Sequence, residues 1–173
     1  MPPGPFLYND YAPNLIGLAL EQAYGARLAP GPMQALWSEL GAEYPAEWLV
    51  DDRGFAWHES GFVVTARDLA RIGELLVDGG MVAQHQVAPT AWIERSRDPA
   101  GRAEVARFAG TPVGYRNAWW TLGDDLVAMG KHGQVMLVAP RTRTVIVRMG
   151  KDGHDETNIA IARRLAAIAD GWR

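Results

Sequence analysis

The sequence of 173 residues contains no cysteine, only three serines and only two lysines. The lack of cysteine excludes a disulfide framework, a thiolate nucleophile and cysteine-ligated zinc. None of Ser38, Ser60 and Ser96 is followed by a lysine three residues later, and "HESGF" around Ser60 lacks the first glycine of a G-x-S-x-G elbow. The short motifs that mark a catalytic serine are therefore missing from this chain.

Other absences narrow the function further. No apolar run reaches the length of a membrane span, and no charged region followed by an apolar stretch marks a signal peptide. The net charge is -3, and Lys and Arg form no basic stripe, so nothing favours nucleic-acid binding. Two lysines against fifteen arginines, with abundant Ala and Gly, are typical of a GC-rich bacterial gene. The sequence does not choose between the bacterial cytoplasm and the periplasm.

The residues that are present predict a folded protein with helices first and strands later. Hydrophobic residues make up 48% and charged residues 21%, which is typical of one globular domain. In the clearest helix, Leu69, Ile72, Leu75 and Leu76 share one face after a Thr65 cap. Periodicity and stop signals predict helices over 14–25, 33–41, 65–80 and 88–96, with an irregular stretch over 42–62.

The character of the sequence changes after this helical part. Short strand-like runs, broken by turn residues, are expected over 117–123, 125–130, 134–140 and 143–150. Val135–Val138 is apolar without alternation, as in a strand covered on both faces. A last helix, 157–172, has Thr157 as its cap and a stripe of Ile161, Leu165, Ile168 and Trp172.

These elements predict an α+β fold. We expect a single, partial domain over 1–173, in which residues 1–110 are mainly helical and residues 111–173 form antiparallel strands and a helix. Within it, the helical segment spans about 11–96, the antiparallel sheet about 117–150, and the covering helix about 157–171.

Tyr8-Asn9-Asp10 is the first stretch that could carry chemistry. A tyrosine beside a carboxamide and a carboxylate could serve acid–base chemistry if a nearby cation lowered its proton affinity. The plainer interpretation is a turn built from Pro, Gly, Asn and Asp with one packed aromatic ring. The residues alone leave both interpretations open.

"GKHGQVMLV" is the second stretch. Gly133 at a strand start would let a ligand approach the backbone closely, and the Gln134 backbone N–H could then face a developing oxyanion. Lys131 and His132 would stand beside it. The alternative is an exposed strand entry with two polar side chains.

Taken together, these stretches resemble the C-terminal half of a serine β-lactamase-like hydrolase of the class C type. This family includes penicillin-recognising enzymes, small-ester hydrolases and 6-aminohexanoate-dimer hydrolase. It carries S-x-x-K, then Y-x-N, then K-T-G or H-x-G. "FLYNDYAPNLIGLALE" resembles the second element, with Tyr8 as its tyrosine, Asp10 in the usual Asn position and Gly17 nine residues after Tyr8. "SGFVVTARDLARIGELLVDGG" resembles the stretch that follows, and "KHGQVMLVAPRTRTVIVRMG" the third element.

The resemblance implies a mechanism and its residues. In the intact enzyme a serine, activated by lysine and tyrosine, would attack an amide or ester carbonyl. Tyr8 would relay the proton to the leaving group, Lys131 or His132 would favour negative charge nearby, and the Gln134 N–H would donate to the oxyanion. Asp10 in place of Asn disfavours penicillin and suits a substrate with a cationic or neutral polar end. No cofactor and no metal are implied.

The S-x-x-K serine and lysine are absent from this chain, so we expect the chain alone to be inactive. We also expect the sheet, without its partner strands, to leave Val135–Val138 less covered. The chain would then pair with a missing N-terminal half or associate with itself through that surface.

Two other functions stay open. One is a non-catalytic binding or assembly protein that keeps part of the fold. The other is a metal-dependent hydrolase that uses His58, His132 and His154 with Asp or Glu, although a polar turn explains His154-Asp155-Glu156 more simply.

Overall fold

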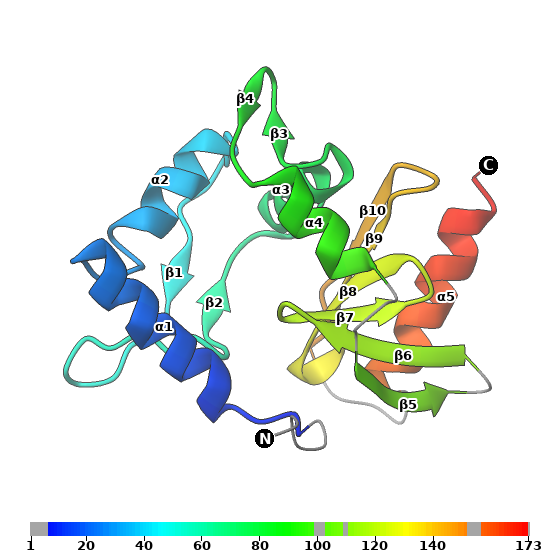
Figure 1. Cartoon of the computed structure of the whole chain (residues 1–173), viewed down its shortest axis with the longest axis horizontal. Helices are drawn as coiled ribbons and strands as arrows, with labels where there is room; N and C mark the ends of the chain where they lie inside the picture. Colours follow the sequence, from blue (N-terminus) through cyan, green and yellow to red (C-terminus); the bar gives the residue numbers. More distant parts are fainter. Residues whose placement is uncertain (1–6, 99–102, 109–110, 152–156, 173) are drawn as a thin grey trace. The chain divides into compact units, whose positions relative to one another are not determined.

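Two compact units, residues 1–65 and 66–173, make up the chain (Figure 1). The structure is a computed structural model that describes residues 7–98, 103–108, 111–151 and 157–172. His154 and its acidic neighbours lie outside the described residues, so the interpretation of that turn stays a prediction.

The first unit is mainly helical. Helix α1 ends at Gly25, whose φ of 66° provides the left-handed stop that a glycine adopts easily. A proline, Pro32, takes the first position of α2, where its missing N–H costs no helical bond. The elements are α1 (Tyr11–Tyr24), α2 (Pro32–Glu39) and an antiparallel pair of short strands, β1 (Glu47–Trp48) and β2 (Phe62–Val63). Both helices were predicted; the short strands lie in the stretch expected to be irregular.

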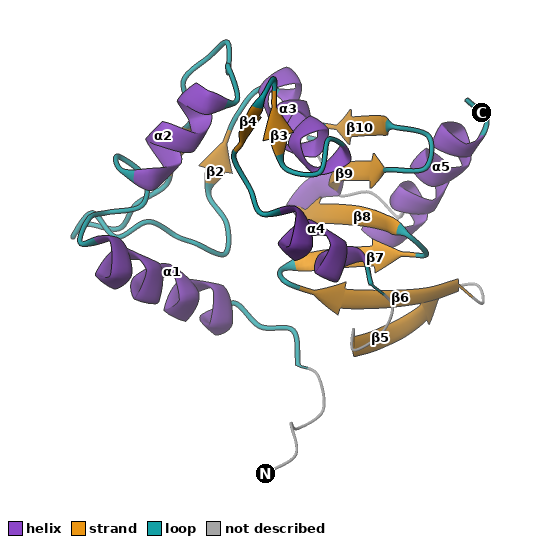
Figure 2. Ribbon diagram, turned by 45° about the horizontal axis from the view of Figure 1, so that its top comes forward, coloured by secondary structure: helices purple, strands orange, loops and turns teal. Residues whose placement is uncertain are grey.

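The second unit holds the sheet. Its strands are antiparallel, and their order β10-β9-β8-β7-β6-β5 is a simple meander (Figure 2). These strands are β5 (Ala103–Phe108), β6 (Thr111–Arg116), β7 (Trp119–Leu122), β8 (Asp125–Gly130), β9 (Gln134–Ala139) and β10 (Thr144–Arg148). The other elements are α3 (Ala66–Val77), the hairpin β3 (Met81–Val82) and β4 (His85–Gln86), α4 (Thr90–Arg97), a 3₁₀ turn (Lys131–Gly133) and α5 (Asn158–Asp170).

Helices cover both faces of this sheet. Val135 and Leu137 of β9 pack with Ile161 of α5 on one face. The alternate residues Met136 and Val138 pack with α3 and α4 on the other face, as the period of two in a strand requires. The predicted α+β architecture is therefore confirmed, and so is the coverage of β9 on both faces.

Three expectations need correction. The sheet begins at 103 rather than 117, because β5 and β6 precede the predicted strands. Val135–Val138 is at most 3% exposed, so the expected loss of cover over this strand is wrong; the helices of the same unit supply the cover.

The predicted stripe of α5 is also partly wrong. Ile161 is buried, but Ile168 and Trp172 are exposed, and Ala162 and Ala169 are buried in their place. The packed face is therefore rotated from the predicted stripe toward these two alanines. Thr157 caps the helix as predicted, by accepting from the Ala160 N–H at 3.4 Å.

No helix within the described residues is long and apolar enough to cross a membrane.

Candidate active site

Tyr8-Asn9-Asp10 forms the entry to α1 in the first unit. The Asn9 side-chain oxygen accepts from the backbone N–H groups of Tyr11 and Ala12, each at 3.0 Å, and so caps the helix. The Asp10 carboxylate is exposed and makes no capping bond. Tyr8 is 52% exposed. One member of the triplet therefore holds the helix, while the tyrosine and the carboxylate face outward.

The Lys131-His132-Gly133 turn joins β8 to β9 in the second unit. His132 has φ 61° and Gly133 φ 78°, so two successive residues adopt the left-handed conformation. This conformation is costly for a histidine, and residues held in it cluster at functional sites. Lys131 and His132 are exposed at the tip of the turn, whereas Gly133 is buried.

Two side chains from distant elements, together with Gln134 next to the turn, hold the turn in place. Arg148 of β10 donates to the Gly133 carbonyl at 2.6 Å, and Asn158 of α5 donates to the Gly130 carbonyl at 2.7 Å. The Gln134 side-chain amide pairs with the backbone of Gly150 in both directions, accepting from its N–H at 3.0 Å and donating to its carbonyl. The position of the turn is therefore fixed by tertiary bonds rather than by local sequence.

The Gln134 backbone N–H does not have the predicted role in this structure. It donates to the Lys131 carbonyl, which closes the turn, instead of facing open space. Sequence reasoning missed the side chain of Gln134, whose partner lies sixteen residues further along the chain. The structure thus brings Lys131, His132, Gly133 and Gln134 together in the second unit.

Tyr8 and Asp10 belong to the first unit, which also contains His58, a half-buried histidine whose ring nitrogens are buried. The ring of His58 packs edge-on against Trp48 and Phe55, with centroids 5.5 and 5.1 Å away, and its backbone N–H donates to the side chain of Asn14. Neither ring nitrogen of His58 has a hydrogen-bond partner among the described residues. The surrounding rings give His58 a packing role that the sequence did not reveal.

The described residues contain no group of three His, Cys, Asp or Glu side chains that could hold a metal ion. His58 and His132 belong to different units. A metal-dependent hydrolase therefore has no support from these side chains.

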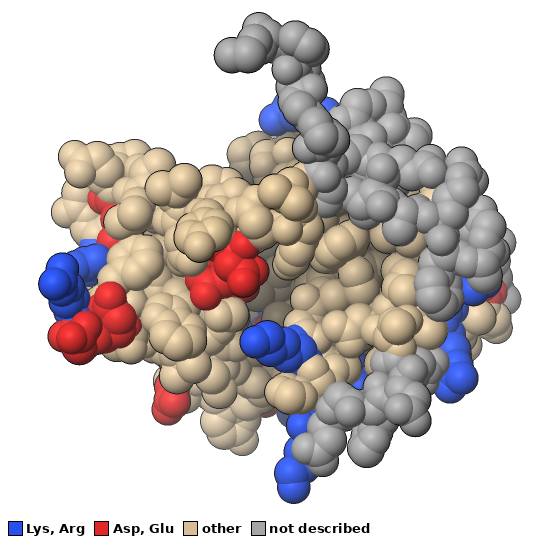
Figure 3. All heavy atoms as spheres, turned by 90° about the horizontal axis from the view of Figure 1, so that it is seen from below, with Lys and Arg blue, Asp and Glu red and all other residues tan. Residues whose placement is uncertain are grey.

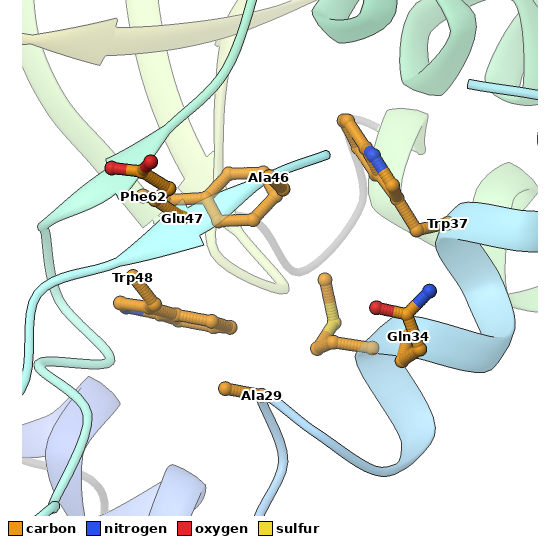
Figure 4. A pocket seen from close by; sticks show the side chains of 8 residues that line it. Ala29, Gln34, Trp37, Ala46, Glu47, Trp48 and Phe62 are labelled. Carbon is orange, nitrogen blue, oxygen red and sulfur yellow. The ribbon is translucent and has the colours of Figure 1, made fainter. Parts of the chain in front are cut away.

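An aromatic hollow lies in the first unit, between α2 and the two short strands (Figure 4). Its volume is about 50 Å³, far below the roughly 300–1,000 Å³ of ligand pockets. Figure 4 shows the rings of Trp37, Trp48 and Phe62 around it, with the Gln34 amide at one side. Both indole N–H groups already donate to backbone carbonyls. The hollow is therefore too small for a substrate of ordinary size.

Asp125 has an altered pKa but lies away from the turn. Burial, and then the neighbouring Asp170 carboxylate, raise the pKa of Asp125 from 3.8 to about 6, while Arg141 opposes the shift. Asp125 opens β8 and Gly130 ends it, which separates them by about 17 Å along the strand. This carboxyl group therefore concerns stability rather than the candidate site.

On the face shown in Figure 3, Lys and Arg side chains lie at separate places and form no continuous band.

Comparison with known proteins shows which proteins this chain is similar to. No family model matches it. It is 31% identical, over 153 residues, to the 6-aminohexanoate-dimer hydrolase of Paenarthrobacter ureafaciens, a match that covers 84% of this chain and 39% of that protein. A solved Bacillus anthracis structure, described as a candidate 6-aminohexanoate-dimer hydrolase, superposes with a TM-score of 0.85 at 25% identity. This match covers 98% of the chain and 45% of the solved protein.

Proposed function

We propose, on the premise that this chain is homologous to part of the β-lactamase-like 6-aminohexanoate-dimer hydrolase, that it is a segment of a serine hydrolase. The intact enzyme cleaves an amide or an ester through an acyl-serine intermediate. The chain spans less than half the length of the relatives it matches. The observation that carries the proposal is the 31% identity over 153 residues.

The proposed chemistry has two steps. The serine oxygen of an S-x-x-K element, which this chain lacks, bonds to the substrate carbonyl carbon as the amine or alcohol departs. The serine gives up its proton through lysine and tyrosine, and Tyr8 passes a proton to the leaving group. Water then cleaves the acyl-serine and restores the hydroxyl. Tyr8 is suited to this role because it is half exposed beside a capped helix start.

Lys131 and His132 supply positive or polar groups at the tip of a rigid turn. A cation favours the ionised phenol of a tyrosine, or a carboxylate on the substrate. The bonds from Arg148 and Gln134 support this proposal, because they hold the turn without using the Lys131 or His132 side chains. The Gln134 side chain holds the turn in position, since the Gln134 backbone N–H already donates to the Lys131 carbonyl.

Asp10 sets the preference for substrate. Its carboxylate is exposed, two residues from Tyr8 and not used in capping, so it places negative charge near the reacting tyrosine. This charge favours a substrate with a cationic or neutral polar end over the anionic penicillins. Asp10→Asn should therefore improve hydrolysis of anionic substrates relative to cationic ones.

The test combines this chain with the complementary segment, by which we mean the part of the Paenarthrobacter hydrolase that lies outside the match. The proposal assigns the S-x-x-K serine to this segment. The chain alone should not hydrolyse p-nitrophenyl esters or nitrocefin. Co-expression with the complementary segment should give ester hydrolysis that Tyr8→Phe abolishes and Tyr44→Phe, at a similarly exposed tyrosine, does not. Turnover by the chain alone that disappears in Tyr8→Phe would refute the proposal.

The second candidate is a non-catalytic binding or assembly protein that retains part of the fold, and the match to less than half of each relative is the observation that favours it. A well-folded complex with the complementary segment that shows no hydrolysis of any ester or amide would support it.

A further inference from the structure

Helix α1 has its polar residues on the inside. Gly17 is its buried residue, and the half-buried Asn14 and Glu21 face the rest of the unit. Asn14 accepts from the His58 N–H at 3.0 Å, and Glu21 accepts from the Leu28 N–H at 3.1 Å. Polar groups and a glycine therefore make the contacts that an apolar stripe makes in an ordinary surface helix.

The opposite side of α1 is apolar and exposed. Six of the sixteen large hydrophobic side chains that are exposed among the described residues lie on this one helix, each between 42% and 81% exposed. At 100° per residue, four of them lie about 100° or more from Gly17, on the side where Gln22 is the one polar side chain. We call this surface the outer face of α1; it consists of Tyr11, Leu15, Ile16 and Leu18.

We propose that the outer face of α1 is the docking surface for the complementary segment, an inference that rests on the proposed function. Exposed apolar areas of this kind mark interaction sites in soluble proteins. The apolar strand β9, where a missing partner was first expected to leave an exposed face, is already buried by its own helices.

Two observations identify the occupant. About three fifths of the Paenarthrobacter hydrolase lies outside its match to this chain, so the relatives contain ample polypeptide to cover a helix. The outer face also begins at Tyr11, three residues after Tyr8, a separation of no more than about 10 Å. A polypeptide docked there lies beside the tyrosine that the proposed serine must reach.

Thiol labelling tests the burial of this surface directly, because the chain has no cysteine of its own. Leu15→Cys places a single thiol on the outer face, and Ile168→Cys places one at an exposed position of α5 as the matched control. Labelling by a maleimide, read by mass spectrometry on this chain, should slow at least tenfold at position 15 when the complementary segment is co-expressed. The rate at position 168 should change less than twofold.

A second pair of variants tests binding. Ile16→Glu should weaken co-purification of the complementary segment at least tenfold, whereas Ile168→Glu should not. Both positions are exposed, so neither substitution removes a core contact.

Each outcome decides the inference. Slow labelling at position 15 in the complex, together with weaker binding of the Ile16→Glu variant, supports the inference. If that complex hydrolyses no ester, the proposed function fails and the docking surface stands. Full activity with fast labelling at position 15 overturns the inference and leaves the function standing. Slow labelling of Leu15→Cys in the isolated chain would show that this chain itself covers the outer face, either within one molecule or in a dimer detected by sedimentation. That result also overturns the inference.

Discussion

Gly17 is the residue of α1 at which the structure leaves no room for a side chain. A Cβ atom there would lie 1.9 Å from Cδ2 and 2.2 Å from Cγ of His58. In an open helix, an alanine is more stable than a glycine by about 1 kcal/mol. Gly17→Ala therefore combines a favourable backbone effect with a severe clash.

The His58 ring has little space in which to retreat, because Trp48 and Phe55 pack against it and Asn14 holds its backbone. Overpacking of this kind costs about 1–3 kcal/mol, and a contact this short calls for the upper end. After the gain in helix propensity, we predict that Gly17→Ala lowers the free energy of unfolding by about 2 kcal/mol.

Urea unfolding followed by far-UV circular dichroism measures this change. Ala19→Gly, at an exposed position of the same helix, is the control and should cost about 1 kcal/mol. In the double variant Gly17→Ala/His58→Ala the clash is gone, so the two changes should be non-additive by more than 1 kcal/mol. A Gly17→Ala protein more stable than the wild type would refute this reasoning.

Three further predictions concern the second unit. Leu137→Ala removes a side chain with no exposed surface and should cost about 2–5 kcal/mol in urea unfolding; a loss below 1 kcal/mol would contradict the described core. Because the folded state holds the pKa of Asp125 near 6, ionisation of this group costs stability as pH rises from 4 to 6, so Asp125→Asn should raise Tm at pH 8 but not below pH 4. The gain should be about 1 kcal/mol once solvent screening of a half-buried group is allowed for. His132→Gly should leave the stability unchanged or raise it, because glycine adopts the left-handed conformation of this position without strain. The control His85→Gly, in β4, should cost about 0.5–1 kcal/mol. Equal losses of stability for the two variants in thermal unfolding would contradict a strained turn.

The sequence was sufficient to predict the helices and the central strands, because their periodicity and their stop signals agree. It did not predict β5 and β6. Pro112 and Gly114 in β6 are residues that normally argue against a strand, and β5 has an irregular register between Glu104 and Ala106. The sheet tolerates them because β5 is its edge strand, and because Pro112 precedes the pairing of β6 with β7, which begins at Val113.

The identity of the site residues stays a prediction. The order of the Tyr8 and His132 stretches indicated the family that the comparisons then supported. The left-handed turn at His132 and the pairing of Gln134 with Gly150 depend on contacts between residues distant in the chain, so no local pattern could reveal them.

The position of the acyl group tests the central claim most directly. The complex of this chain with the complementary segment is incubated with a slowly hydrolysed p-nitrophenyl ester, quenched, and analysed by peptide mass spectrometry. We predict an acyl adduct on the serine of the S-x-x-K element in the complementary segment, and none on this chain. An adduct on Ser38, Ser60 or Ser96, or on Tyr8, would contradict the account.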